Sequence, residues 1–134
     1  MRVLVVEDSD ARVLAFQCVF SNDDVWFARD VAQAVRLLAR RTYDLVCLDH
    51  DLEPPERGVN GQYVARLITH LRRAPAVLIH SWNRPGALAI SRILGADVEW
   101  MIAPFGATTA DDIRALMERT AWDAVFGGKV ADDV

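Results

Sequence analysis

The sequence has no long hydrophobic segment. Among its 134 residues, uninterrupted apolar runs such as Ala74 to Ile79 are far short of the roughly 20 residues that cross a bilayer. The N-terminus enters an apolar stretch after a single Arg2 and has no small-residue cleavage site, which argues against a signal peptide. We therefore expect a cytoplasmic protein that makes no membrane contact.

Cysteine is also scarce, with only two residues in the chain. Cys18 falls in a helical pattern and Cys47 falls inside an apolar strand pattern. This usage predicts two reduced thiols in the core and argues against a disulfide.

An excess of basic residues is absent as well. The net charge is -4 and the isoelectric point is near 5.3. An extended nucleic-acid groove needs a basic face, so this balance argues against one.

The sequence does contain enough apolar residues for one core, because 52% of it is hydrophobic. We expect a single domain over residues 1–128, followed by a polar tail at 129–134. No internal repeat or low-complexity segment is visible.

Strand patterns alternate with helical patterns along this domain. Strands are expected at 2–6, 24–28, 44–48, 76–80 and 98–102, and helices at 10–20, 30–41, 61–73, after Asn83, and at 109–126. Asp30 and Gln33 form a capping-box pattern at the start of the second helix. Three strands are nearly continuous apolar runs, as in a sheet covered on both faces. The pattern predicts an α/β fold with a five-stranded parallel sheet and helices on both faces.

Ionisable residues follow three of these strands. The first strand ends in Glu7 and Asp8, and the next two groups are Asp49-His50-Asp51 after the third strand and His80-Ser81-Trp82-Asn83 after the fourth. In such sheets, ligands bind outside the carboxyl ends of the strands. We expect these side chains to meet at one edge.

Several carboxylates at one edge require compensation. Two of them about 4 Å apart repel by roughly 4 kcal/mol at an effective dielectric of about 20. Glu7, Asp8 and Asp49 would therefore take up protons or bind a cation, and hard oxygen ligands suit Mg²⁺ or Mn²⁺. Alternatively, Glu7 and Asp8 only cap the first helix, although capping does not explain Asp49 on a separate strand.

Four stretches together resemble a response-regulator receiver domain, which has a flavodoxin-like fold. They are "VLVVEDS", "YDLVCLD", the "NG" before the third helix, and "GADVEWMIAPF", and the resemblance extends to about residue 120. It implies that Glu7 and Asp8 hold Mg²⁺ and that Asp49 accepts a phosphoryl group. It also implies that the backbone carbonyl of Asp51 is a third metal ligand.

Two positions depart from the receiver pattern. Ala103 stands where receivers usually carry a phosphate-binding lysine, and His80 stands where they carry Thr or Ser, with Ser81 next. The first change removes a charge-assisted contact, and the second adds a group that exchanges protons near neutral pH. Both weigh against ordinary phosphoryl switching.

The motifs "LDHDL" and "HSWN" resemble a divergent branch, the cyclic-phosphate processing receiver domains, which are predicted to act on cyclic phosphate ends of RNA or related nucleotides. This resemblance implies a metal-dependent phosphodiesterase with His80 and Asp49 in the chemistry. Ser81 and Asn83 could bond phosphate or ribose oxygens. Trp82 could stack on a base or could pack against its own loop.

Several alternatives remain open from the sequence. His50 belongs either to the catalytic site or to a structural hydrogen bond, and His80 is either catalytic or a satisfied core histidine. The 52–61 loop is either a lid or a stiff connection. The partner is either a cyclic-phosphate nucleotide or RNA end, or a signalling protein bound by a phosphorylated or degenerate receiver, and a homodimer is also open.

Overall fold

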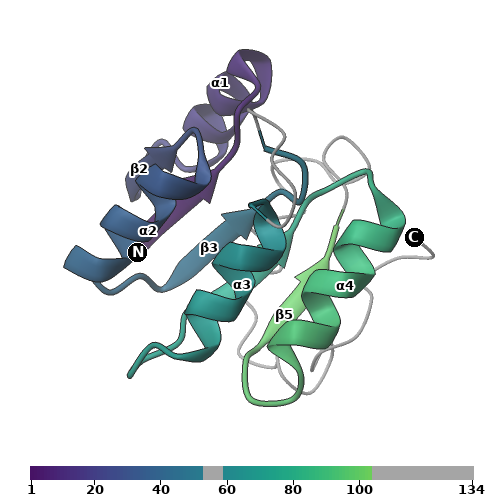
Figure 1. Ribbon diagram of the computed structural model, residues 1–134. Coiled ribbons are helices and arrows are strands. Elements are labelled where there is room, and N and C mark those ends of the chain that lie inside the picture. The colour runs from purple at the N-terminus through teal and green to yellow at the C-terminus, as the bar shows by residue number, and fades with distance from the viewer. Residues whose placement is uncertain (53–58, 104–134) are drawn as a thin grey trace.

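The computed structural model describes residues 1–52 and 59–103 (Figure 1). Its strands are β1 (Arg2–Val6), β2 (Asp24–Ala28), β3 (Leu45–Leu48), β4 (Ala76–Ile79) and β5 (Trp100–Ile102). Its helices are α1 (Asp10–Val19), α2 (Val31–Arg40), α3 (Gly61–Thr69) and α4 (Arg84–Leu94). The last expected helix, the C-terminal tail and most of the 52–61 loop lie outside the described residues.

The five strands form one parallel sheet in the order β2-β1-β3-β4-β5. Helices α2, α3 and α4 cover one face and α1 lies on the other, as Figure 1 shows. The expected α/β architecture with helices on both faces is therefore confirmed. No helix within the described ranges is long and apolar enough to cross a membrane.

Alternate residues of the buried strands serve the two faces of the sheet. In β1, Leu4 and Val6 pack toward α2, α3 and α4, whereas Val3 and Val5 pack toward α1. All four side chains are fully buried, as expected for strands covered on both sides. The same alternation decides which way the residues after each strand point.

The predicted element boundaries are nearly correct. β1, β2 and the starts of α1, α3 and α4 lie where the sequence places them, while β3 begins one residue later and β5 two residues later. α3 ends at Thr69 instead of continuing to residue 73, because His70 closes a tight turn by donating its backbone N–H to the Leu67 carbonyl at 3.0 Å.

The capping-box pattern is realised with a one-residue offset. The Asp30 carboxylate accepts from the Gln33 backbone N–H at 2.8 Å, as expected. The Gln33 side chain, however, accepts from the Arg29 amide at 2.7 Å and not from the amide of Asp30 itself. Both ends of the arrangement still satisfy backbone donors at the start of α2.

The expectation of two core thiols is wrong for Cys18. Cys47 is buried in β3, but Cys18 is exposed on α1. Its helical position lies outside the stripe of α1 that packs on the sheet, which consists of Val13, Phe16 and Val19. Both thiols are free.

Candidate functional site

The residues that follow β1, β3 and β4 form one row across the sheet. Val6, Leu48 and Ile79 are register partners at the ends of these strands. The next residues are Glu7, Asp49 and His80, and the ladder continues through them, since the Asp49 amide donates to Val6 and the His80 amide to Leu48. We call Glu7, Asp49 and His80 the rim cluster. By strand alternation their side chains lie on the α1 face.

The rim cluster is compact and buried. One ligand-type atom from each residue lies within 4.8 Å of the others, a distance close to the usual spacing of neighbouring strands. The exposed fractions of Glu7, Asp49 and His80 are 0%, 4% and 1%. The expected convergence of strand ends therefore brings together two carboxylates and one imidazole.

His80 bonds directly to Glu7. Its Nε2 lies 3.1 Å from Glu7 Oε1, and its ring meets the Phe16 ring edge-on with centroids 4.9 Å apart. Its Nδ1 is buried and has no hydrogen-bond partner within the described part of the chain. A fully satisfied core histidine would have partners at both nitrogens, so one nitrogen is left for another group.

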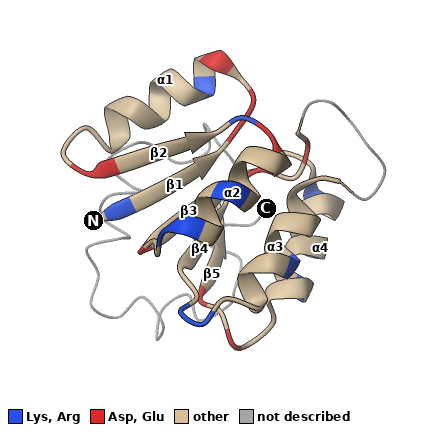
Figure 2. Ribbon diagram, turned by 60° about the vertical axis from the view of Figure 1, so that its left-hand side comes forward, with Lys and Arg blue, Asp and Glu red and all other residues tan. Residues whose placement is uncertain are grey.

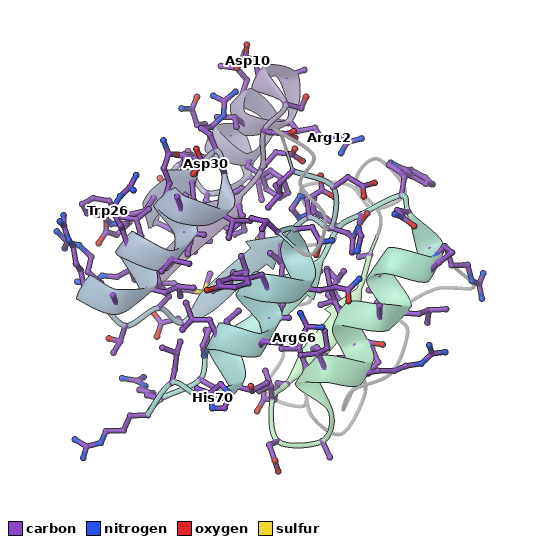
Figure 3. All side chains as sticks on the ribbon, in the orientation of Figure 1. Asp10, Arg12, Trp26, Asp30, Arg66 and His70 are labelled. Carbon is purple, nitrogen blue, oxygen red and sulfur yellow. The ribbon has the colours of Figure 1, made fainter. Side chains whose placement is uncertain are left out.

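Arg12 is a member of the site that the sequence analysis missed. Its Nη1 lies 3.4 Å from Glu7 Oε1 and 3.6 Å from Asp49 Oδ2, from the first turn of α1 (Figure 3). The available signal was its position in the first turn after the acidic pair, next to the N-cap Ser9 that receives its backbone N–H. Arg12 supplies positive charge between the two carboxylates.

The two carboxylates of the rim cluster differ in acidity. Burial, the largest influence on Glu7, raises its pKa, but the hydrogen bond and charge of His80 and the Ser9 amide together lower the pKa to about 2. The Asp8 and Ser9 amides donate to Glu7 Oε2 at 2.9 and 3.1 Å. Glu7 is therefore ionised at neutral pH.

Asp49 has the opposite tendency. Burial raises its pKa and the Glu7 charge adds to this effect, while His80, the Ser81 hydroxyl and the His50 amide lower it without reversing it. An ionised Asp49 is thus stabilised less by its surroundings than by water. A further cation beside it, in addition to Arg12, would relieve this cost.

Asp8 and Asp51 flank the rim cluster and do not enter it. Asp8 is half-buried, and its backbone carbonyl accepts from the Arg29 guanidinium at 2.9 Å. The Asp51 side chain is exposed and accepts from Asn83 Nδ2 at 3.1 Å. Red segments at the arrowhead ends of the strands in Figure 2 mark this acidic edge. The roles of Asp8 and of the Asp51 carbonyl as metal ligands remain predictions.

His50 points away from Asp49, as strand alternation predicts. Its Nδ1 lies 2.7 Å from Asp51 Oδ1, and its Nε2 lies 2.9 Å from Gln62 Nε2. The hydrogen bond from His50 is the main cause of a lowered pKa at Asp51. These contacts join the end of β3 to the start of α3, so they favour the structural reading of His50.

The His50 ring packs directly against Gly86, where there is no room for a side chain. A Cβ at Gly86 would lie 2.4 Å from His50 Cγ. We expect Gly86→Ala to lower the free energy of unfolding by about 1–3 kcal/mol, the usual cost of overpacking, as measured by urea denaturation. In a His50→Ala background the same substitution should cost much less. An equal cost in both backgrounds would show that the ring is not the obstacle.

The residues after β4 have distinct surroundings. Ser81 is buried and its hydroxyl accepts from the Asn83 amide at 3.1 Å. Asn83 caps α4 by accepting from the Gly86 amide at 3.0 Å. Trp82 is 58% exposed, which favours a surface role over the alternative of packing against its loop.

Ala103, the residue after β5, occupies the fourth position of the row, next to His80. Its amide donates to the Ile79 carbonyl at 2.9 Å, and its side chain is buried in the apolar cluster on the α1 face. The β5 end of the row therefore has no cationic side chain at this position.

Solved structures with the same fold include several receiver domains. The CheY-like receiver domain from Methylobacillus flagellatus has a TM-score of 0.67 and 13% identity, over 88% of this chain and 96% of that one. The one from Methanospirillum hungatei has a TM-score of 0.70 and 16% identity, over 87% and 90%. NtrX from Brucella abortus has a TM-score of 0.70 and 22% identity, but this chain spans only 26% of it.

These likenesses define the class as a flavodoxin-fold receiver domain. The sequence model of the cyclic-phosphate processing receiver domain matches residues 2–96, so the chain belongs to that family. No curated protein matches the sequence significantly. The resemblance found in the sequence is thereby confirmed.

Proposed function

We propose that this protein is a metal-dependent phosphodiesterase that opens cyclic phosphates of nucleotides or RNA ends. The supporting observation is the rim cluster, where a buried histidine bonds to one of two buried carboxylates at the ligand-binding edge of the sheet. A receiver that only accepts a phosphoryl group has no need of an imidazole at this position.

The donor set fits a divalent cation. Glu7 and Asp49 offer hard carboxylate oxygens, and the unfavourable burial of ionised Asp49 is the kind of cost that a cation offsets. We propose Mg²⁺ or Mn²⁺, held by Glu7 and Asp49 with Asp8 and the Asp51 carbonyl. When bound, such an ion activates water and stabilises charge on phosphoryl oxygens.

His80 would move the proton that ring opening requires. Hydrolysis adds water across one P–O bond of the ring, so the ribose oxygen leaves with a proton and phosphorus gains a hydroxyl group. Imidazole can exchange protons near neutral pH, and the His80 contact with Glu7 fixes the orientation of the ring. His50 is held by other partners and is better suited to positioning Asp51.

Substrate contacts would come from the segment after β4. Trp82 is exposed beside the rim cluster and could stack on a nucleobase. The Ser81 hydroxyl lies beside Asp49 and could bond a phosphoryl oxygen. The Asn83 side chain is engaged with Gly86 and Asp51, so its proposed contact with substrate requires an exchange of partners.

A hydrolysis screen tests this proposal. We expect 2′,3′-cyclic nucleotides or cyclic-ended RNA to be opened to monoesters with Mg²⁺ or Mn²⁺ and not with EDTA, as followed by ³¹P NMR. Trp82→Ala should raise KM for cyclic nucleotides and leave KM unchanged for a cyclic phosphate without a base. No hydrolysis of any of these substrates would exclude the proposed activity.

The second candidate is a signalling receiver that acts through a protein partner. The observation in its favour is that Asp49, the position of the phosphoryl acceptor in receivers, is retained at the end of β3. The two candidates differ at the β5 end of the row.

Phosphoryl mimicry separates the two candidates. We expect acetyl phosphate or beryllofluoride to change the NMR shifts of Trp100–Ile102 very little, because Ala103 cannot pair with a phosphoryl group. Ala103→Lys is the matched comparison and should make the same residues more responsive. Large Asp49-dependent shifts in the unaltered protein would instead favour the signalling receiver.

A further inference from the structure

A hollow lies at the edge of the sheet opposite the rim cluster. It has a volume of about 320 Å³ and is formed by residues 38–43, 71–73 and 75, at the end of α2 and in the segment after α3. These segments lead into β3 and β4, whereas the rim cluster follows the same strands. In Figure 1 the two helices end together at this edge. The two sites share no residue.

The hollow is basic although the protein carries a net charge of -4. Four of its ten lining residues are arginines and none is acidic: Arg40, Arg41, Arg72 and Arg73. Figure 2 shows blue segments on α2 and in the turns at this end of the molecule. Helix dipoles favour a basic residue at each helix end, but they do not require a hollow between them.

The four arginines are not equally engaged. Arg41 lies over the Trp26 ring at 4.0 Å, and Arg73 pairs with Asp44 at 3.8 Å. Arg40 and Arg72 are exposed and make no ion pair with the described residues. Two guanidinium groups, one from the end of α2 and one from the segment after α3, are therefore available to an anion.

Tyr43 is one of the residues that line the hollow. Its side chain is 3% exposed, and its hydroxyl is buried without a hydrogen-bond partner in the described part of the chain. Burial raises the pKa of Tyr43, so the hydroxyl keeps its proton. Buried hydroxyls are normally satisfied, and an unsatisfied donor costs free energy that a ligand oxygen can recover.

The remaining lining is largely apolar and includes Leu38, Leu71 and Pro75. A ligand for this hollow should combine a flat apolar part with negative charge, because arginine pairs with phosphate and stacks on planar rings. The volume lies at the lower end of the range of about 300–1,000 Å³ for small-molecule pockets, so it suits a small ligand.

We propose that this hollow binds a nucleoside phosphate. The phosphate would lie between Arg40 and Arg72, the base would pack on the apolar lining, and the Tyr43 hydroxyl would donate to a ligand oxygen after a small shift of its ring. This site does not depend on the proposed phosphodiesterase activity, because it needs neither the rim cluster nor a metal ion.

The test uses ADP as the probe in a buffer that contains EDTA, so that no metal-mediated binding occurs at the rim cluster. We expect ADP to shift the amide NMR signals of residues 38–43 and 71–75 and to leave those of Glu7, Asp49 and His80 in place. Arg72→Gln and Tyr43→Phe should each weaken binding about tenfold, the size expected for one lost hydrogen bond to a charged oxygen. Thermal denaturation will establish that both variants are folded.

Arg66→Gln is the matched control, since it removes the same charge from an exposed position of α3 outside the hollow. It should change ADP affinity less than twofold. Equal losses in Arg66→Gln and Arg72→Gln would reduce the binding to general charge attraction and overturn the proposal. Unchanged affinity in Tyr43→Phe, inorganic phosphate binding as tightly as ADP, or no shifts at the hollow would also overturn it.

Discussion

His80→Gln is expected to lower kcat for a cyclic phosphate by about two or more orders of magnitude, the usual contribution of a positioned acid or base. The glutamine amide can still bond to Glu7 in place of Nε2, but it cannot exchange protons near pH 7. Metal affinity and KM should change much less, because the carboxylates and the segment after β4 remain. The loss of activity would therefore reflect a slower chemical step and not weaker substrate binding.

His70→Gln provides the control, because His70 is an exposed histidine at the end of α3, away from the rim cluster. It should leave kcat unchanged. His80→Ala should also lose activity but in addition lower stability by roughly 1–3 kcal/mol, since Glu7 then lacks its buried partner. A fully active His80→Gln protein would remove this residue from the mechanism.

Asp49→Asn should raise the melting temperature by a few degrees at neutral pH in EDTA, although it removes the proposed metal ligand. Burial raises the pKa of Asp49 in the folded state, so its ionised form opposes folding. This penalty is absent below the ordinary pKa of 3.8 and appears as the pH rises above it. Asparagine keeps the oxygen that accepts from the His50 amide at 2.8 Å and avoids the penalty.

Glu7→Gln makes the same chemical change with the opposite expected sign. The folded-state pKa of Glu7 is about 2 against an ordinary 4.5, so its ionised form adds stability above pH 4.5 that is lost as the pH falls toward 2. Glu7→Gln should therefore lower the melting temperature at neutral pH. If both variants shift the melting temperature in the same direction, the assigned difference between the two carboxylates is wrong.

Divalent ions complete this experiment. Mg²⁺ or Mn²⁺ should raise the melting temperature of the unaltered protein, because a ligand that binds only the folded state stabilises it. Asp49→Asn should lose most of this gain, so its advantage in EDTA should shrink or reverse when the ion is added. Calorimetry that detects no divalent binding, with no difference in Asp49→Asn, would contradict the metal site.

Much of the fold depends on local sequence features, so it could be predicted from the sequence. The apolar run of β1 and the cap residues Ser9, Asp30 and Asn83 place strand and helix starts correctly because each acts within a few residues. The end of α3 was misplaced because a basic segment after His70 keeps high helical propensity, while the tight turn at His70 stops the helix. Cys18 was misassigned because the packed stripe of α1 is narrow.

The site was predictable in its place and less so in its contacts. Parallel strands bring their carboxyl ends to one edge, so Glu7, Asp49 and His80 could be grouped from the sequence alone. The contacts among these three side chains could not be predicted, because they depend on the register of three strands and on the approach of α1. Arg12 lies in the first turn after the acidic pair, but its contacts with both carboxylates depend on the same approach of α1 and could not be derived from that position alone.

The row that contains Glu7, Asp49 and His80 continues to Ala103, and the backbone ladder holds every position in it. These hydrogen bonds use only main-chain atoms, so they do not depend on which side chains stand at these positions. The spacing of the four positions therefore stays the same when the side chain at any one of them is substituted. If the proposed function is correct, exchanges at the positions of His80 and Ala103 alone would change the chemistry of the edge from phosphoryl acceptance to proton exchange while every strand stays in place.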